Sequence, residues 1–263
     1  MTASCRRIRF RRRNELLVVC CAFSSLHSVW GWILTNTPRT RRHSINKRAL
    51  SFSSSPAQPF GEQSYWQDFY RSRDAGFTWY AGWEDLQPLV EDFLQRDHRD
   101  THVLVPGVGT DSLLTDLYDA GYIVSAFDYA TESIAFCRSN LNGRLIDLEN
   151  ADCRSLPYTS QTFDVVLDKG TLDAIYINGA TNPEKIENLQ KAVTELQRVL
   201  RPGGIFWSLS GICIEALPTL ASTWDGWECF ADGSFYTTKD GYTSNNVDGS
   251  LFVWKKPSSV VNE

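Results

Sequence analysis

The chain has 263 residues, of which 42% are hydrophobic and 13% aromatic, and this fits one globular domain with a tail. Its net charge of −5 hides an uneven distribution, because residues 1–60 hold 11 Lys and Arg with one acid, whereas residues 61–263 hold 15 basic and 30 acidic residues. The excess of acids in residues 61–263 argues against a nucleic-acid partner and suits a basic or lysine-bearing protein partner. More often, such an excess serves only to keep the surface of a protein solvated.

The first 60 residues have the composition of a targeting segment. Arginines cluster near the start, an apolar stretch follows at 16–34, and Arg- and Ser-rich sequence without acids comes next. Organelle presequences are composed in this way, and residues 48–50 (Arg-Ala-Leu) before Ser51 resemble a mitochondrial processing site. A secretory signal followed by a plastid transit peptide is the alternative, and serines and a histidine weaken a membrane anchor at 16–34. We expect an organellar protein, mitochondrial rather than plastid, without a stable membrane span.

An aromatic-rich segment, residues 61–100, opens the main domain, which we expect to span 61–263. Three rings are spaced to share one face of a helix: Trp66, Phe69 and Tyr70. Trp79 and Tyr80 fall between two helical patterns, where large rings need a surface to cover. An amphipathic helix is then predicted over Leu86–Arg96. The segment is expected to form lid helices on the domain.

A strand, a glycine turn and a helix follow in the stretch VLVPGVGTDS. The apolar run His102–Pro106 predicts a buried strand, and Gly107-Val108-Gly109 predicts a turn into a helical pattern of leucines. Two glycines let the backbone pass close to a ligand, and Asp111 or Ser112 is expected to cap the helix. This unit is typical of a nucleotide-binding sheet.

The helix is expected to end at Gly121, and a second strand, Tyr122–Asp128, ends in a carboxylate. Asp128 follows Gly109 by 19 residues, the separation at which an acid can accept hydrogen bonds from ribose hydroxyls. A nicotinamide enzyme would use the same geometry. However, Ser112 stands where that fingerprint has a third Gly or Ala, which counts against a pyrophosphate-bearing cofactor.

The rest of the chain continues to alternate helices and strands. In chain order we expect a helix Thr131–Leu141 capped by Thr131, strands Arg144–Leu148 and Phe163–Leu167, a helix from an Asn182 cap through Leu200 to Pro202-Gly203-Gly204, a strand Ile205–Leu209, and an antiparallel pair Trp227–Phe230 and Leu251–Trp254. This order predicts an α/β fold with a mostly parallel seven-stranded sheet, helices on both faces and an antiparallel C-terminal edge pair. Ligands of such sheets bind beyond the carboxyl ends of the strands.

Cysteine and histidine usage removes several kinds of chemistry. Four cysteines lie outside the targeting segment, and they form no CxxC pair: Cys137, Cys153, Cys213 and Cys229. We therefore expect neither a zinc knuckle nor a disulfide framework, and no metal site. His98 and His102 are the only histidines of this part, and no GxSxG motif occurs, which argues against a Ser/His/Asp hydrolase.

Three strings then decide between cofactor classes: Asp152-Cys153 after the third strand, FDVVLDKGTLDAI at 163–175, and LRPGG at 200–204. With them the chain resembles class I S-adenosylmethionine-dependent methyltransferases, which implies their Rossmann-like fold. It is more similar to the methyltransferase-like branch that includes elongation factor 1-alpha lysine methyltransferases and the mitochondrial citrate synthase lysine methyltransferase. LDKGTLDA, residues 167–174, is the most specific mark of that branch.

The resemblance covers roughly residues 64–210. Tyr65-Trp66 with Phe69-Tyr70, and then Trp79-Tyr80, are similar to the YWxxRY and WF/WY segments of the branch. The chain departs from the pattern at Phe69, which replaces an Arg, at Pro106 before the first glycine, and at Thr110-Asp111. These departures bear on the substrate more than on the cofactor.

The resemblance implies S-adenosylmethionine as the cofactor and ten residues as its contacts: Trp66, Tyr70, Trp79, Gly107, Gly109, Asp128, Tyr129, Asp152, Cys153 and Lys169. Asp128 and Tyr129 would hold the ribose and cover the adenine, and Asp152 with the Cys153 backbone would read the adenine edge. Aromatic faces suit a sulfonium, because its positive charge is attracted to the ring quadrupole.

The resemblance further implies direct methyl transfer to a lysine of a protein, an elongation factor or a citrate-synthase-like protein. The lysine must first lose a proton, since its reference pKa is about 10.4. Rings such as Trp79 and Tyr80 would desolvate it, and Asp168 or Asp173 would orient the amine or take the proton, with Tyr176 an equal candidate. Two alternatives stay open: a thiol- or halide-type small-molecule methyltransferase, and a relative that binds the cofactor without turnover.

Overall fold

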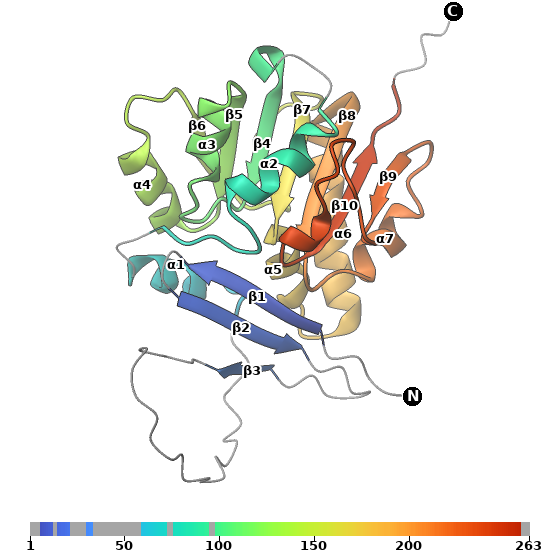
Figure 1. The fold of residues 1–263 in the computed structure, drawn as a ribbon. Helices are drawn as coiled ribbons and strands as arrows, with labels where there is room; N and C mark the ends of the chain where they lie inside the picture. The colour runs from blue at the N-terminus through green and yellow to red at the C-terminus, as the bar shows by residue number, and fades with distance from the viewer. Residues whose placement is uncertain are drawn as a thin grey trace, which may run out of the picture. The chain divides into compact units, whose positions relative to one another are not determined.

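The computed structural model describes residues 59–72, 76–94 and 98–258, together with the backbone of three strands before them (Figure 1). The chain divides into two compact units, Met1–Gln58 and Pro59–Glu263. In the first unit, β1 (Arg6–Arg12), β2 (Glu15–Cys21) and β3 (Trp30–Ile33) form an antiparallel sheet in that order. The processing site expected at residues 48–51 lies outside the described residues, so the targeting role of this unit stays a prediction.

The second unit is built on a seven-stranded sheet in the order β6-β5-β4-β7-β8-β10-β9. Its strands are β4 (His102–Pro106), β5 (Ile123–Asp128), β6 (Asp147–Asn150), β7 (Phe163–Lys169), β8 (Leu200–Ser210), β9 (Glu228–Asp232) and β10 (Ser250–Lys255). The first five in spatial order are parallel, whereas β10 is antiparallel to both β8 and β9. The predicted sheet, including its antiparallel C-terminal pair, is confirmed.

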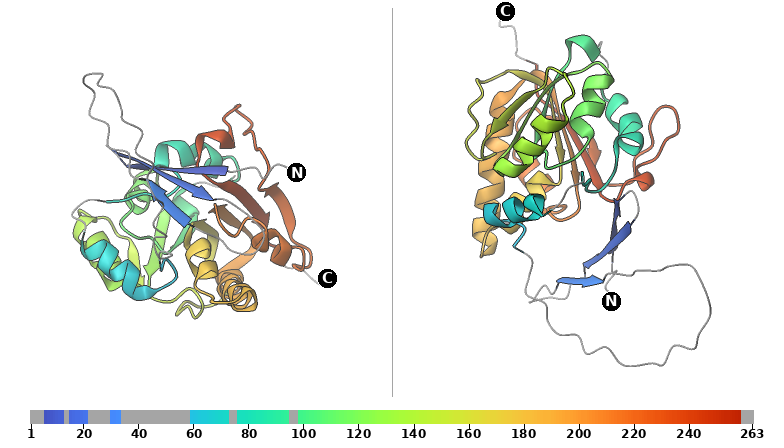
Figure 2. Two further views of the ribbon diagram at one scale, coloured as in Figure 1. Left: turned by 90° about the horizontal axis from the view of Figure 1, so that it is seen from below. Right: turned by 90° about the vertical axis from the view of Figure 1, so that its left-hand side faces the viewer.

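Helices cover both faces of this sheet, as predicted, with α2 and α3 on one face and α6 on the other (Figure 2). The helices are α1 (Gln63–Arg71), α2 (Trp83–Glu91), α3 (Leu113–Asp119), α4 (Thr131–Asn140), α5 (Thr171–Ile177), α6 (Asn182–Val199) and α7 (Ala216–Ala221), with short 3-10 turns at His98–Asp100 and Ser244–Asn246. Among the described residues, no helix is both long and apolar enough to cross a membrane.

Helix α6 shows how the apolar pattern builds the core. Leu189, Val193 and Leu196 recur at helical spacing, are almost completely buried, and belong to one cluster with Phe206 of β8. The predicted cap Asn182 is wrong, because Thr181 caps the helix. Its hydroxyl accepts the N–H of Glu184, whose carboxylate accepts the N–H of Thr181 in return. A capping box satisfies two free donors, which a lone Asn cap would not.

Several other boundaries differ from the sequence-based ones. The predicted Thr131 cap is wrong because Thr131 is already helical, and the N–H of Ala130 before it is bound by the Asp128 carboxylate at 2.9 Å. Leu200 belongs to β8, which runs through Pro202 and the two glycines, so these residues do not separate helix from strand. Strand β6 begins three residues later than expected, and α2 both starts and ends earlier.

The end of α3 agrees with the prediction made from Gly121. The N–H of Gly121 donates to the carbonyl of Tyr118 at 2.9 Å, and the N–H of Tyr122 donates to the carbonyl of Leu117 at 3.1 Å. These two bonds are those of a Schellman motif, which satisfies carbonyls left free at a helix C-terminus. Strand β5 can therefore start directly after the helix.

His102 lies at the amino end of β4, on the edge of the sheet opposite to the carboxyl ends. Its Nε2 is 2.9 Å from the hydroxyl of Ser125, which is 3.4 Å from the Asp147 carboxylate, and its ring packs edge-on against Phe163. Burial lowers the pKa of His102, and the charge of Arg201 acts in the same direction, against the nearby Asp147 and Asp164. The folded protein thus favours the neutral imidazole.

This arrangement predicts acid sensitivity at His102. Because its folded pKa is depressed, its stabilising contribution is present above the unfolded pKa of about 6.5 and is lost as the pH falls through the folded value. We expect the melting temperature of the wild-type chain to fall more steeply from neutral to mildly acidic pH than that of His102→Gln. One proton limits the difference to about 1.4 kcal/mol per pH unit. Equal slopes in thermal scans would contradict this reading.

Candidate functional site

The glycine turn joins β4 to α3 at the carboxyl edge of the sheet. Gly107 and Gly109 have φ angles of +51° and +60°, in the left-handed region that side chains disfavour. A Cβ at Gly109 would lie 2.7 Å from the hydroxyl of Tyr70, and one at Gly107 would collide with Thr171, whose hydroxyl donates to the Pro106 carbonyl. Both glycines are therefore required by geometry, as the sequence predicted for a backbone that approaches a ligand.

Asp128 ends β5 beside this turn and holds it in shape. Its carboxylate accepts the N–H of Gly109 at 2.8 Å, the N–H of Ala130 at 2.9 Å and the hydroxyl of Ser133 at 3.1 Å. Burial raises the pKa of Asp128, and these hydrogen bonds oppose that rise. A carboxylate offers about four acceptor positions, and the backbone of Tyr129 is a fourth donor to this group, so the chain's own donors already occupy Asp128. The ribose role stays a prediction, and the contact with Gly109 adds an ordering role.

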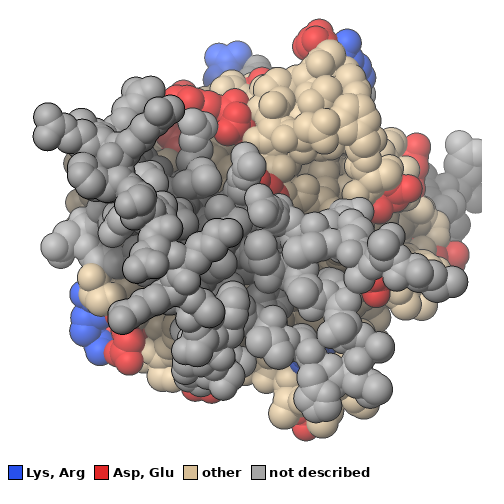
Figure 3. Space-filling view, turned by 60° about the horizontal axis from the view of Figure 1, so that its bottom comes forward, with Lys and Arg blue, Asp and Glu red and all other residues tan. Residues whose placement is uncertain are grey.

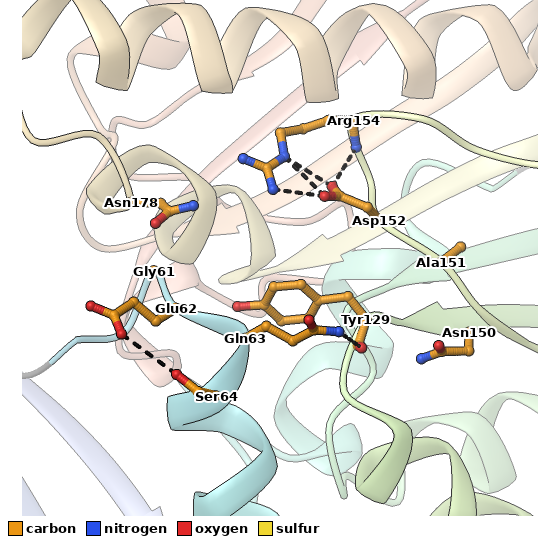
Figure 4. A pocket seen from close by; sticks show the side chains of 10 residues that line it. All are labelled: Gly61, Glu62, Gln63, Ser64, Tyr129, Asn150, Ala151, Asp152, Arg154 and Asn178. Carbon is orange, nitrogen blue, oxygen red and sulfur yellow. Dashed lines mark hydrogen bonds and ion pairs between the residues drawn. The ribbon is translucent and has the colours of Figure 1, made fainter.

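A pocket of about 500 Å³ opens next to Asp128, within the range of small-molecule sites. It is lined by Gly61, Glu62, Gln63, Ser64, Tyr129, Asn150, Ala151, Asp152, Arg154 and Asn178. Figure 4 shows the ring of Tyr129 between the start of α1 and the Asp152–Arg154 pair. The pocket thus brings together Tyr129 and Asp152, which the sequence analysis had assigned to the adenine.

Asp152 is bound by Arg154, a residue that the sequence analysis did not single out. The guanidinium reaches the carboxylate at 2.7 Å, and the N–H of Arg154 donates to the same group at 2.9 Å. Partial burial favours a higher pKa, but the bonds to Arg154 outweigh it and hold the pKa of Asp152 below its usual range. Asp152 is therefore a charged acceptor at the pocket wall. The side chain of Cys153 points into the core, which leaves its backbone for the predicted adenine contact.

An aromatic cluster covers the same edge, and we call it the aromatic lid: Phe60, Tyr65, Trp66, Phe69, Tyr70, Phe77 and Trp79. Trp66 stacks on Tyr70 with centroids 5.7 Å apart and meets Trp79 edge-on at 5.8 Å. The lid packs on Ala130 and Tyr129, and Gln63 at its start donates to the Tyr129 carbonyl at 2.5 Å. The predicted lid rings thus gather at the edge where the pocket opens.

Lys169, the last residue of β7, is buried at the inner side of the lid. Its ammonium is 2.6 Å from the Asp111 carboxylate and 2.7 Å from the Trp79 carbonyl, and the two charged side chains are only 6% and 8% exposed. Thr78 joins the group through its hydroxyl, which donates to Asp111 at 2.6 Å. This ion pair ties the lid segment to the glycine turn. The cofactor contact assigned to Lys169 stays a prediction.

Asp168 and Asp173, the two carboxylates proposed for the amine, are both completely engaged. Asp168 accepts the N–H groups of Thr171 and Leu172 and the hydroxyl of Ser208, so it caps α5, and burial raises its pKa to about 7. These contacts give Asp168 a capping role at the start of α5, in place of the role toward the amine that the resemblance implied. The Asp168 side chain is completely buried, so it lies beneath the surface of the site.

Asp173, in α5, binds residues from two other parts of the chain, and we call this group the Asp173 latch. Its carboxylate accepts the hydroxyls of Tyr80 and Ser210 and the N–H groups of Gly211, Ile212 and Cys213. Tyr80 has a φ of +63°, unusual for a residue with a side chain, and its ring lies against Gly170. Burial and the Asp173 charge raise the pKa of Tyr80 well above its usual value, so its hydroxyl stays protonated.

The sequence analysis missed Arg154, the Asp111–Lys169 pair and the loop after β8. Ser210 could have been found, because it follows a predicted strand at the carboxyl edge, where site residues collect. Arg154 lies only two residues after Asp152, and its N–H donates to that carboxylate within one turn, so this pair is local. Asp111 and Lys169 are 58 residues apart, and their pairing depends on how distant segments meet.

Residues 104–208, which span β4 to β8 and hold most of these groups, match the family model of a methyltransferase domain. This part of the chain is similar to a methyltransferase domain. Its cofactor is S-adenosylmethionine, and the pocket, the glycine turn and the acceptors Asp128 and Asp152 fit this molecule. In the pocket, the ring of Tyr129 provides an apolar face and Asp152 a charged acceptor, the two kinds of surface that an adenosyl group needs.

Curated relatives of this methyltransferase domain are similar over 158 to 160 residues. EEF1A lysine methyltransferase 4 of Bos taurus is 31% identical, with 57% of this chain and 61% of the relative covered. The eEF1A lysine and N-terminal methyltransferase of Xenopus laevis is 32% identical, with 59% of this chain and 22% of the relative covered. The chain thus spans about three fifths of the first relative and about a fifth of the second.

A solved structure shows the same fold at low identity. Phosphoethanolamine N-methyltransferase 1 of Haemonchus contortus, in complex with phosphoethanolamine and S-adenosylhomocysteine, aligns with a TM-score of 0.50 and 14% identity. The alignment covers 76% of this chain and 49% of that one. This likeness supports the Rossmann-like architecture of the methyltransferase domain.

Removing Lys169 should destabilise the domain strongly. Lys169→Met leaves the Asp111 charge buried without its cation, which costs about 3–5 kcal/mol in comparable pairs. The double variant Lys169→Met with Asp111→Asn should recover much of this loss, because the uncompensated charge is gone. Lys191→Met on the exposed face of α6 is the control and should change stability little. Urea unfolding followed by fluorescence gives the free energy of unfolding of the wild type and the three variants. If Lys169→Met lowers this free energy no more than Lys191→Met does, the buried ion pair is not stabilising and the assignment is contradicted.

Asp128→Ala should weaken S-adenosylmethionine binding. Loss of one hydrogen bond to a charged group corresponds to about 10- to 100-fold in affinity, and the glycine turn also loses its Gly109 contact. Calorimetric titration measures the dissociation constant, and circular dichroism checks the fold. Asp147→Ala, at the amino end of the neighbouring β6, is the matched control and should bind normally. Wild-type affinity in Asp128→Ala would reject the placement of the ribose.

Proposed function

We propose that the chain transfers the methyl group of S-adenosylmethionine to a lysine side chain of a protein. The observation that carries this proposal is the Asp173 latch, which places Tyr80 and the loop after β8 at the carboxyl edge occupied by the glycine turn and the aromatic lid. The names of the curated relatives, both lysine methyltransferases, support the same acceptor class. The acidic composition of residues 61–263 is compatible with a lysine-bearing partner.

In this reaction the protein mainly aligns the lysine nitrogen with the methyl group and removes water from the amine. The cofactor supplies an activated methyl group on a positively charged sulfur. The neutral lysine nitrogen forms the new C–N bond as the bond from sulfur to the methyl carbon breaks, so the two must be held in line. Trp79 and Tyr80 provide apolar surface that favours the uncharged amine, because desolvation lowers the pKa of a lysine.

The latch assigns a positioning role to Asp173 in this reaction. Five donors occupy its carboxylate, more than the roughly four acceptor positions of the group, so it is a poor proton acceptor. It instead fixes Tyr80 against Gly170 and holds the Gly211–Cys213 loop. The proton of the lysine then leaves to solvent as the amine enters the site.

The test uses tritiated S-adenosylmethionine and an extract of mitochondria, chosen because residues 1–60 have a presequence composition. We expect the chain to label a protein, and peptide mapping to place the label on lysine. The Asp128→Ala variant serves as the inactive control. Label only on low-mass thiols would replace the proposal with the small-molecule alternative. A chain that binds the cofactor in calorimetry but labels nothing in mitochondrial, plastid or cytosolic extracts would be a relative without turnover.

A further inference from the structure

The loop between β9 and β10, residues 233–249, stands at the carboxyl edge of the sheet. Ser250 at the start of β10 pairs with Ser210 at the carboxyl end of β8, and Asp232 at the end of β9 pairs with Phe252. Both ends of the loop therefore emerge on the edge that holds the pocket and the Asp173 latch. The sequence analysis predicted the two strands but gave no role to the loop between them.

This loop is fixed against the lid side of the domain. The hydroxyl of Tyr236 donates to Asp92, and that of Tyr242 donates to Asp85 at 3.1 Å, both in or next to α2. The N–H of Asp248 donates to the carbonyl of Tyr80 at 3.0 Å, which places the end of the loop beside the latch. A loop held at three points is a platform with a defined shape at the mouth of the site.

The loop and β9 expose large aromatic side chains. Four large hydrophobic residues are exposed in the described part of the chain, and two of them lie here, Phe230 at 40% and Phe235 at 61%. The other two, Ile123 and Leu145, lie at or before the amino ends of β5 and β6, at the opposite edge. Phe93 stacks on Phe230 and also packs on Tyr236, so the patch has an aromatic base. Exposed aromatics in one patch mark an interaction surface.

The stretch that carries these rings is acidic. Residues 228–250 contain four acids and a single base, Lys239. Three of the acids are exposed, Glu228, Asp232 and Asp240. Figure 3 views the molecule toward the edge where α1 and α5 lie and shows acidic side chains spread over the described part of that face, with basic ones mainly at its rim. Glu228 lies at the other end of β9, opposite Lys255, so we call Phe93, Phe230, Phe235 and Tyr236 with Asp232 and Asp240 the Phe235 surface.

We propose that the Phe235 surface docks a basic segment of the protein that carries the target lysine, with apolar side chains set among its charges. This rests on the proposed function. The acids attract a positively charged segment, Phe230 and Phe235 offer it apolar contact, and the bond from Asp248 to Tyr80 connects the surface with the latch. The occupant is therefore recognised beyond the lysine itself, at a distance from the methyl group.

The test compares methyl transfer kinetics of the wild-type chain and two variants, Phe235→Ser and the charge reversal Asp232→Lys with Asp240→Lys. The probe is the extract protein that the wild-type chain labels, purified as acceptor. Loss of one interface anchor corresponds to more than about 1 kcal/mol, so we expect the KM for this acceptor to rise about tenfold. The kcat at saturation and the KM for S-adenosylmethionine should stay unchanged. The effect of the charge reversal should shrink at high salt.

Leu145→Ser is the matched control, because Leu145 is 85% exposed at the opposite edge. Equal acceptor KM values in Phe235→Ser and Leu145→Ser would overturn the docking surface and leave the methyl transfer intact. A wild-type chain that labels no protein would instead refute the proposed function. Sedimentation of the wild-type chain checks a second copy as occupant. A dimer that Phe235→Ser dissociates would also overturn the proposal, since the unpaired edge of β9 would then serve self-association.

Discussion

The Asp173 carboxylate joins three segments that are far apart in the sequence: α5, which carries it, the segment at Tyr80, and residues 210–213 at the end of β8. A buried carboxylate is costly unless donors surround it, so these segments stabilise the charge and are positioned by it at the same time. The left-handed backbone of Tyr80 is kept in place by three contacts. Its hydroxyl donates to Asp173, its carbonyl accepts the N–H of Asp248, and its ring lies against Gly170. Tyr80, Asp173 and residues 210–213 therefore form one structural unit.

Two further carboxylates extend this arrangement along the carboxyl edge. Asp128 holds the glycine turn, and Asp111 with Lys169 ties that turn to the lid. Each carboxylate has an ordering role within the chain in addition to any contact with the cofactor. The acidic residues of this edge thus divide into buried ones that order the site, such as Asp128 and Asp173, and exposed ones, such as Asp232 and Asp240.

Much of the fold followed from local patterns, and the errors share one cause. The strand His102–Pro106, the end of α3 at Gly121 and the apolar stripe of α6 depend on neighbours a few residues away, and all were predicted correctly. The cap of α6 was misplaced by one residue because Thr181 and Asn182 have similar capping preferences, and only the reciprocal bond to Glu184 separates them. The Pro-Gly-Gly run was read as the end of the helix before a new strand, whereas in the structure it is an irregularity inside β8, where the N–H of Gly203 donates to the carbonyl of Lys256.

The sequence by itself determined the sheet, its glycine turn, the aromatic lid and the resemblance that leads to S-adenosylmethionine, because periodicity, turn chemistry and motif spacing are local properties of the chain. Only the tertiary structure decided which carboxylates accept hydrogen bonds from donors of the chain itself. Asp168 is bound by Ser208, Asp173 joins α5 to Tyr80 and to residues 210–213, and Asp111 is bound by Lys169. These partners come from segments that meet only when the parallel strands end at one edge, and no spacing in the sequence encodes that meeting.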